Sequence, residues 1–347
     1  MSAVLDEAYE RLHTTGPEWG GNLSNHGPMA AEVLARRGHA ADVHRWVDAY
    51  LRRLDELPAA SEVITEQTWQ QALGNGRIGD WTAYLTREAE LQPWRELLVT
   101  WWPRLLPGIA AGATHGVIRV GHVVRNLLES QADDPVAVTE LAHALGYWAA
   151  RSRTVPGVLA PAGELGPAEA LDAIPHLAEQ DGPIAGRLGR LADLSGWPDS
   201  VAALRPAAGP EDVRARLNEL ISAATLRYLT YGHGSPVLLV HTATAPNAVL
   251  HILPALPDPL WAPSLSAAWA ASAAITAGYA PAQPMPRDER PAPPTGEDAV
   301  HDLVELAVGH GDEHVIKFAD TAVDVYERTA DPDALAAAVH ASVLLSR

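Results

Sequence analysis

The segment GDEHVIKFAD, residues 311–320, contains the only lysine of the 347-residue chain, although lysine and arginine together number 25. This residue, Lys317, follows His314 by three positions, so both side chains project from the same side of a helix. Arginine could equally well provide a surface charge or an ion pair with Asp312, Glu313 or Asp320. The retained lysine therefore favours chemistry that a guanidinium cannot do. The candidates are a neutral amine acting as base or nucleophile, and an amine carboxylated by CO2 to give an oxygen ligand.

Fifteen histidines are present, and four groups of them share one setting, a turn rich in Gly, Pro or Thr at the edge of an apolar helix. A buried imidazole without a partner costs about 1–3 kcal/mol, and one shared metal ion would satisfy several imidazoles at once. A histidine site without sulfur suits Fe, Mn, Co, Ni or Zn. The chain has no HExxH or HxH pair, so capping or core roles for single histidines stay open. The four groups contain His26; His115 and His122; His241 and His251; and His310 and His314.

Composition and charge limit the classes of partner. The net charge is −18 and no cluster of basic residues occurs, which excludes nucleic acid and anionic membranes as expected partners and favours a small molecule. Cysteine is absent, which excludes disulfides and thiolate ligands. No run of 18 apolar residues and no signal peptide are found, so we expect a soluble, cytoplasmic protein without a membrane span.

Helical periodicity dominates the chain and predicts an all-α fold. We expect one large helical domain over residues 1–347, with the metal site in its helical core and Pro- and Gly-rich loops around it. The Pro-rich stretch 281–297 predicts an exposed loop. PVLLVHTA, residues 236–243, is the main strand candidate and equally suits the entry of a buried helix. The predicted helices are 30–38, 42–57, 83–91, 94–106, 116–130, 136–152, 167–179, 211–230, 264–278, 299–308, 312–329 and 332–345.

The four histidine segments, taken in order, resemble the questin oxidase-like family of polyketide pathways. The resemblance covers most of the chain, from about residue 6 to 343, and rests on Asn25-His26, His115, His241-Thr242 and Asp312-Glu313-His314-Val315-Ile316-Lys317. It implies an α-helical oxygenase that cleaves or oxidises a ring of a polycyclic aromatic polyketide, such as an anthraquinone, with O2. The reaction would be Baeyer–Villiger-like or dioxygenase-like.

The resemblance also implies the cofactor, a mononuclear non-heme Fe(II). Its imidazole ligands would be His26, His115, His241 and His314, and a CO2-derived carbamate on Lys317 would supply an oxygen ligand. Many relatives carry more histidines in the first two segments, where this chain has Met29 and Arg119, so the substrate is expected to differ while the metal site is kept. The chain lacks a dinucleotide fingerprint, which leaves NADPH only as an external reductant.

Residues close in sequence to these ligands are candidates for substrate contacts. Thr242 is a catalytic candidate together with Lys317, and Arg119, His122 and His251 are candidates to orient a phenol or quinone oxygen. Several tryptophans suit stacking on a flat substrate, although aromatic residues at helical spacing are more often core. They are Trp101, Trp102, Trp148, Trp261 and Trp269.

Two other function classes stay open. A metal hydrolase would use the carboxylated lysine to bridge two ions, and two zinc ions per chain would identify it. A non-catalytic helical binding protein would use its histidines structurally and would contain no metal. A homodimer is expected only because homodimers are common.

Overall fold

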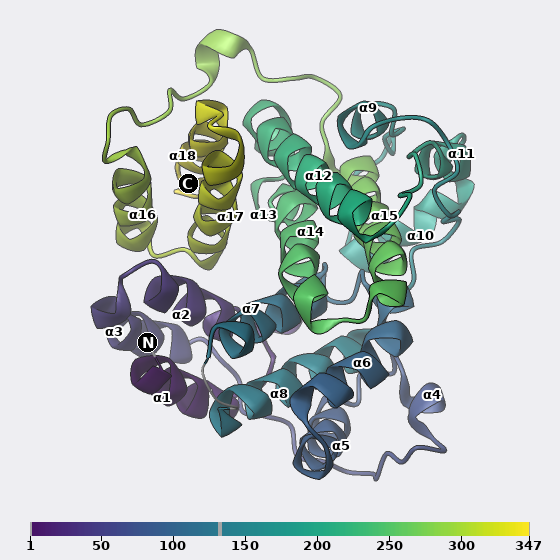
Figure 1. The fold of residues 1–347 in the computed structure, drawn as a ribbon, viewed down its shortest axis with the longest axis vertical. Coiled ribbons are helices and arrows are strands. Elements are labelled where there is room, and N and C mark those ends of the chain that lie inside the picture. Colours follow the sequence, from purple (N-terminus) through teal and green to yellow (C-terminus); the bar gives the residue numbers. More distant parts are fainter. Residues whose placement is uncertain (1, 131–133, 347) are drawn as a thin grey trace. The chain divides into compact units, whose positions relative to one another are not determined.

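A computed structural model describes residues 2–130 and 134–346; the two ends of the expected 1–347 domain and positions 131–133 lie outside it. The described residues are predominantly helical, as Figure 1 shows. Their sheet content is one short antiparallel pair, Glu18–Trp19 (β1) with Leu23–Ser24 (β2). The predicted all-α class is therefore confirmed.

The chain divides into two compact units, and the first comprises the residues up to Thr154 together with His251–Leu260. Its most extensive contacts join α8 to α5 and α7, while α1, α2 and α3 pack on one another. Gly146 of α8 allows the close approach of α5, because a Cβ there would lie 3.2 Å from the Thr82 nitrogen. The helices of this unit are α1 (Ser2–His13), α2 (Gly27–Arg36), α3 (Ala40–Leu51), α4 (Trp69–Ala72), α5 (Ile78–Leu91), α6 (Trp94–Leu105), α7 (His115–Glu129) and α8 (Pro135–Arg151).

The second unit comprises Val155–Leu250 and the residues from Trp261 onward. Within it α12 packs against α9, α15, α17 and α18, and α17 packs against α16 and α18. The elements are α9 (Pro167–Asp172), α10 (Ile184–Arg190), α11 (Trp197–Ala202), α12 (Pro210–Tyr231), α13 (Pro236–Leu239), α14 (His241–Ile252, whose last two residues belong to the first unit), α15 (Trp261–Tyr279), α16 (Ala299–His310), α17 (Glu313–Thr329) and α18 (Pro332–Leu345). The expectation of a single domain stays a prediction.

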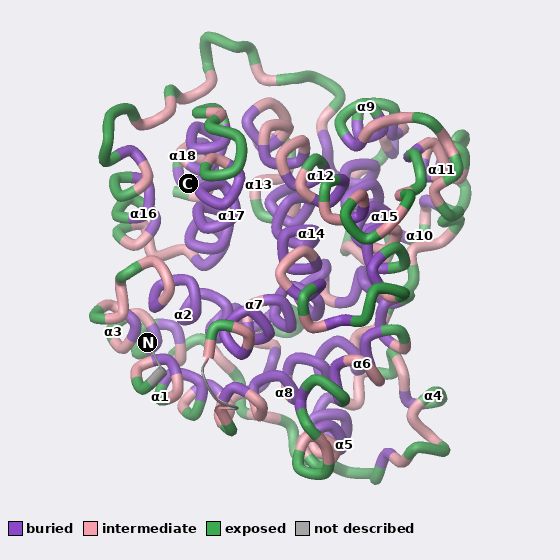
Figure 2. Tube along the Cα trace, in the orientation of Figure 1, coloured by how far each residue is buried: buried purple, intermediate pink, exposed green. Residues whose placement is uncertain are grey.

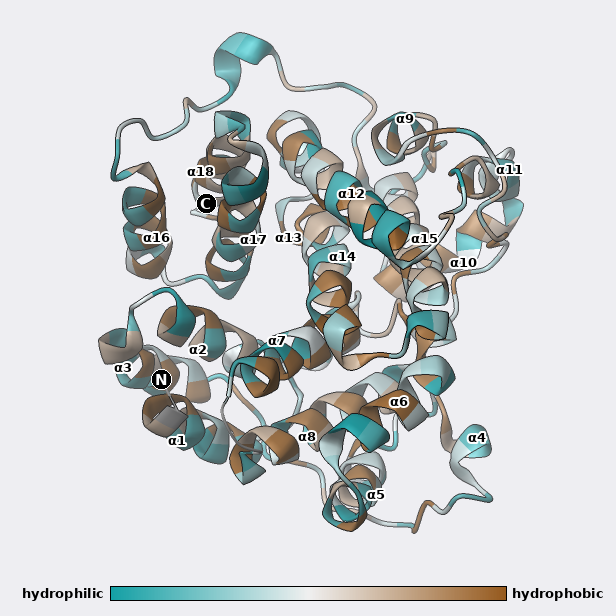
Figure 3. Ribbon diagram, viewed as in Figure 1, coloured by the Kyte–Doolittle hydropathy of each residue, from teal (hydrophilic) through white to brown (hydrophobic). Residues whose placement is uncertain are grey.

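Burial follows the sequence pattern in most places. The stretch 281–297 is largely exposed (Figure 2), as its proline content predicts. The helix α17 behaves differently: Figure 3 shows hydrophilic residues along it, yet most of it is buried in Figure 2. Its buried polar side chains include His314, Lys317 and Asp320. A buried helix with such residues needs hydrogen-bond or ligand partners for them.

One segment, Pro236–Ala255, is long and apolar enough to span a membrane by length and composition alone. Of its apolar window, 72 % is buried inside the protein, which is typical of a core helix in a soluble protein. This segment contains residues 236–243, where a strand was one of the two alternatives. The structure forms the helix entry instead, because a core helix satisfies its own backbone groups without a neighbouring strand.

Candidate metal centre

The four singled-out histidines all lie where a helix begins. His26 is the N-cap of α2, with a proline in the following turn, and His115 and His241 are the first residues of α7 and α14. His314 is the second residue of α17, directly after the N-cap Asp312, whose carboxylate accepts hydrogen bonds from the backbone N–H groups of His314 (2.8 Å) and Val315 (3.3 Å). Of α2, α7 and α17, the three of these helices whose caps are described, only α17 has a side-chain cap, so His314 is the histidine whose backbone is fixed by capping.

The first unit contains the pair His26 and His115. Their ring centroids lie 4.3 Å apart with the rings nearly perpendicular, and both residues are buried. The backbone N–H of His26 donates to the Tyr50 hydroxyl (2.8 Å), which also lies 3.5 Å from Nδ1 of the same ring. Nδ1 of His115 is hydrogen-bonded to the carbonyl oxygen of Gly112. Each ring is therefore held from its Nδ1 side, which leaves Nε2 as the ligand atom.

The second unit contains the pair His241 and His314, with ring centroids 5.8 Å apart. Nδ1 of His241 donates to the carbonyl oxygen of Leu238 (3.2 Å), and Nδ1 of His314 lies 3.3 Å from a carboxylate oxygen of Asp312. Burial lowers the pKa of His241 well below its ordinary value, and the charges of Lys317 and His314 lower it further. The ring is thus neutral at neutral pH, which is the form that binds a metal.

Lys317 is 1 % exposed, and its Nζ has no hydrogen-bond partner among the described residues. Burial lowers the pKa of this amine from 10.5 to about 7, against the opposing charges of Glu313 and Asp312. In a large fraction of the molecules the Lys317 amine is therefore uncharged at neutral pH. Neither a surface amine nor an ion-paired amine agrees with this environment, so those two interpretations of the lone lysine lose support.

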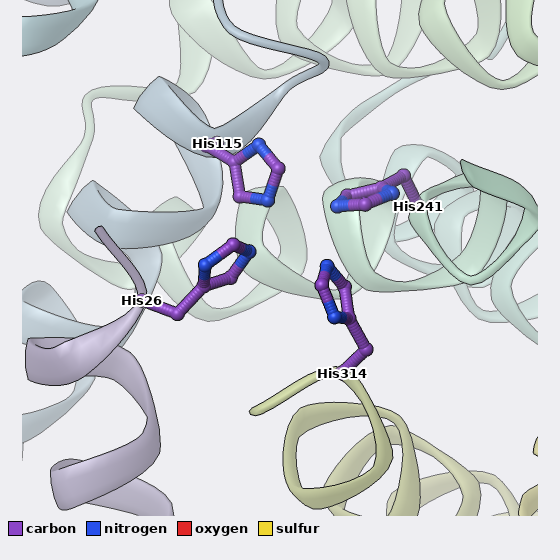
Figure 4. Close-up of side chains that lie close together, drawn as sticks. All are labelled: His26, His115, His241 and His314. Atoms are coloured by element: carbon purple, nitrogen blue, oxygen red, sulfur yellow. The ribbon is translucent and has the colours of Figure 1, made fainter. Parts of the chain in front are cut away.

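Taken together, the four imidazoles offer one ligand atom each, and these four atoms all lie within 4.8 Å of one another. Figure 4 shows each ring with a nitrogen turned toward the other rings. Imidazole nitrogens bound to one ion at about 2.0–2.1 Å lie at most about 4.2 Å apart, so small side-chain shifts suffice. The donor set, four buried imidazoles without sulfur, fits a borderline transition-metal ion such as Fe(II) or Zn(II).

The predicted substrate residues have other partners in the structure. The Arg119 guanidinium forms two hydrogen bonds with buried Glu140 (2.5 and 2.7 Å), and His122 is hydrogen-bonded to buried Glu32 (2.8 Å). The Thr242 hydroxyl donates to the Leu239 carbonyl (2.7 Å). It also borders a small cavity of about 20 Å³ among α12, α13 and α15, room for about one water molecule. His251 is half-buried near the end of α14. Roles for these four residues in substrate binding or catalysis stay predictions.

A polar cluster joins α14 to α17 in the second unit, at residues that periodicity alone does not single out. The side-chain amide of Asn247 donates to Asp324 (3.1 Å) and to the Thr321 hydroxyl (3.4 Å). Thr244 is buried, and within the described residues its hydroxyl and the Asn247 carbonyl oxygen have no hydrogen-bond partner. The only signal in the sequence is nearness, because these residues follow His241 and His314 by one to three turns along α14 and α17.

Comparisons with known proteins add no name to this site. The chain matches no family model, no curated protein and no solved structure. The site therefore has to be interpreted from its own chemistry.

Proposed function

We propose that this protein is a non-heme iron oxygenase that oxidises or cleaves a ring of a hydroxylated polycyclic aromatic molecule with O2. The observation that carries the proposal is the set of four buried imidazole nitrogens within 4.8 Å of one another. The proposal is also supported by the buried Lys317 amine one turn from His314, an amine that has no hydrogen-bond partner among the described residues. The resemblance of the same five residues to the questin oxidase-like pattern supplies the reaction class and the anthraquinone-like substrate class.

His26, His115, His241 and His314 would hold the ion, and Lys317 would supply an oxygen ligand after reaction with CO2. In that reaction the neutral Nζ attacks the carbon of CO2, a C–N bond forms and one proton is released to solvent. A buried neutral amine is thereby replaced by a carboxylate whose charge a metal can neutralise. Bound ferrous iron would supply the electrons that O2 needs to react with a closed-shell aromatic molecule.

The chain's own residues have three tasks in this proposal. The carbonyl oxygens of Gly112 and Leu238 hold the His115 and His241 rings from behind and fix the proton on Nδ1. The buried surroundings limit the access of water. The Thr244 hydroxyl and the Asn247 carbonyl oxygen, one and two turns along α14 from His241, would be available to a ligand hydroxyl or carbonyl.

The proposal is tested first by metal analysis of proteins purified identically: wild type, His26→Ala, His314→Ala and His340→Ala. His340 is a matched control, since it is equally buried and lies on α18 outside the four-histidine group. We expect about one iron per chain in the wild type and the control, and a loss of metal in the other two variants. Two zinc ions per chain would favour the hydrolase, and a folded wild type that takes up no metal would contradict any metal enzyme.

The oxygenase chemistry is tested separately by O2 consumption. Iron-loaded protein should consume O2 with 1,8-dihydroxyanthraquinone or a related hydroxylated polycyclic aromatic, and Lys317→Arg should abolish this because arginine forms no carbamate. An active Lys317→Arg variant would contradict the ligand role of Lys317. Iron binding without O2 uptake on any compound of this class would leave the metal site intact and contradict the substrate class.

A further inference from the structure

We propose that an aromatic chain in the first unit, formed by Trp148, Trp102, Trp101 and Tyr84, carries single electrons from beneath the surface at Glu66 toward the helix that presents His115. Its function would be to reduce damaging oxidants formed near the site when O2 reacts without substrate. The protective role rests on the proposed oxygenase function. The path for electrons rests on the packing of the rings alone.

The inner end of the chain touches α7. A Cβ placed on Gly116 would lie 2.8 Å from both Cβ and Cγ of Trp148, so this indole packs directly on the backbone one residue after His115. Only a glycine permits this approach. The indole N–H of Trp148 donates to the carbonyl oxygen of Gly108 (3.0 Å), which fixes the ring in place.

The middle of the chain joins two groups of packed rings through neighbouring residues of α6. The rings of Trp148 and Trp102 have centroids 5.4 Å apart at 85°, and Trp101 directly precedes Trp102, so an electron passes between these two indoles across the backbone that links them. Trp101 then contacts Tyr84 at 5.7 Å. It also contacts Trp81 at 5.5 Å and Trp69 at 5.4 Å, which form side branches. Trp148, Trp102 and Trp101 are fully buried, so water does not interrupt the path.

The outer end has a proton acceptor. Tyr84 is itself buried, and its hydroxyl donates to a carboxylate oxygen of Glu66 (3.4 Å), whose exposed side chain also pairs with Arg104 (2.8 Å). A phenol loses an electron readily only when its proton can leave at the same time, and Glu66 is placed to accept it. Arg104 also lies over the rings of Trp69 and Trp101, at 4.7 and 4.8 Å.

A one-electron oxidant formed near the site by incomplete reduction of O2 takes one electron from Trp148 and is reduced. The Trp148 cation keeps its N–H proton, because a carbonyl oxygen is a poor base, and it regains an electron from Trp102. Trp102 is refilled from Trp101, and Trp101 from Tyr84, whose proton passes to Glu66. A soluble one-electron reductant such as ascorbate restores the neutral Tyr84 radical, and the proton returns.

Core packing alone does not explain why these positions are tryptophan rather than phenylalanine. The chain has 11 tryptophans and one phenylalanine, although phenylalanine fills an apolar core without an indole N–H to satisfy. For Trp101 that N–H is buried and has no hydrogen-bond partner in the described part of the chain. A position selected only for volume would not favour this residue.

The experiment begins on the metal-free protein. The chain has no cysteine, so Gln70→Cys, exposed beside Trp69 on α4, accepts a ruthenium photo-oxidant at one place. After flash oxidation under O2, mass spectrometry measures oxidation of Trp148. We expect Trp148 to be oxidised in this background, to be protected by Trp102→Phe, and to be unaffected by Trp197→Phe, a buried indole of the second unit.

A second variant separates conduction from folding. Tyr84→Phe removes the final electron donor, so oxidation of Trp148 should rise although the core is barely changed. Trp148 that stays intact in the labelled background, or that is oxidised equally after Trp102→Phe, would overturn the chain. This outcome is independent of whether iron binds.

The protective role is tested on iron-loaded protein with ascorbate and O2 but no aromatic substrate. Trp102→Phe should increase oxidative modification of His115, measured by mass spectrometry, relative to wild type and to Trp197→Phe. Equal modification in all three proteins would overturn the protective role. If no iron binds, the proposed function fails, whereas the photochemical result still decides whether the chain conducts.

Discussion

At the scale of single residues, Lys317 has an unusual environment for an amine. It is 1 % exposed, its Nζ has no hydrogen-bond partner among the described residues, and its pKa is lowered to about 7, chiefly by burial. A lysine in this state destabilises the metal-free fold, since the unfolded chain solvates the same amine fully. Such a cost is typical of a residue kept for function rather than for stability.

The cost depends on pH in a defined direction. Between about pH 7 and the ordinary lysine pKa of 10.5, the unfolded chain binds a proton at Lys317 that the folded chain does not bind. The free energy of unfolding therefore rises with pH in this window, by up to about 1.4 kcal/mol per pH unit from this group. Lys317→Met removes the titration. We expect its stability advantage over wild type to be largest near pH 7 and to shrink toward pH 10.

Denaturant unfolding of both proteins, free of metal and CO2, measures this difference. Wild type and Lys317→Met share every other titrating group, so their difference isolates the amine. If the difference in the free energy of unfolding stays constant from pH 7 to 10, Lys317 does not titrate differently in the folded and unfolded chains. The conclusion that Lys317 is a buried neutral amine would then be wrong.

The sequence identifies the candidate metal ligands better than it identifies the hydrogen-bond partners of the residues near them. His26, His115, His241 and His314 stand at recognisable helix starts, and the composition alone draws attention to Lys317. The partners of Arg119 and His122 are different. Glu140 and Glu32 lie 21 and 90 positions away along the chain from these residues. Such pairings depend on how helices pack, which periodicity within one segment does not determine.

At the scale of elements, the N-terminus of α17 combines a cap with the candidate ligands. Asp312 caps the helix, and its carboxylate lies 3.3 Å from Nδ1 of His314. Burial by itself would raise the Asp312 pKa, but the hydrogen bonds and charge of His314 and the backbone N–H of Val315 lower it to about 2. The carboxylate is thus ionised at neutral pH and serves both the helix and the imidazole.

Asp312→Ala should therefore reduce both stability and metal affinity. We expect a loss of about 1 kcal/mol of stability from the cap and a metal affinity about 10–100-fold weaker from the lost contact behind His314. The matched control is Asp331→Ala, which removes the equivalent cap of α18. Thermal unfolding and titration with ferrous iron measure the two effects.

Asp331→Ala should lower stability by a similar amount and leave metal affinity unchanged. Equal affinities for the two alanine variants would show that Asp312 is only a helix cap. Asp312→Asn, which keeps the side-chain oxygen, should retain most of both properties.

The sequence predicts helix positions well where the apolar pattern is long. It predicts helix ends poorly where a local residue such as proline stops the helix. The predicted helix 167–179 ends at Asp172 in the structure. Pro175 explains the early end, because a proline disfavours helical conformation at the residue before it. The predicted helix 30–38 ends at Arg36, and Gly38 adopts a φ of +90° after it, close to the stop that the glycine indicates.

At the scale of the whole molecule, the proposed ligands are distributed over four helices that are remote in sequence. His26 and His115 belong to the first unit, and His241 and His314 belong to the second. Periodicity gives no information on how such helices are brought together. In the sequence, only the order of the four histidine motifs indicates a shared metal site. The single-domain expectation has the same origin and stays a prediction.

A shared ion has a consequence that two separate histidine pairs do not have. Ligand binding to the native state alone stabilises it by about 2.7 kcal/mol when the free ion is at 100 times its dissociation constant. If one ion uses all four imidazoles, adding iron should slow amide hydrogen exchange at the starts of α2, α7, α14 and α17 together. His26→Ala, which alters only the first pair, should then remove the protection at α14 and α17 as well. Hydrogen exchange with mass spectrometry resolves these four segments, and His340→Ala provides the comparison for a buried histidine outside the group. Protection that persists at α14 and α17 in His26→Ala would mean that His241 and His314 bind the ion without the first pair, and the four-histidine centre would be wrong.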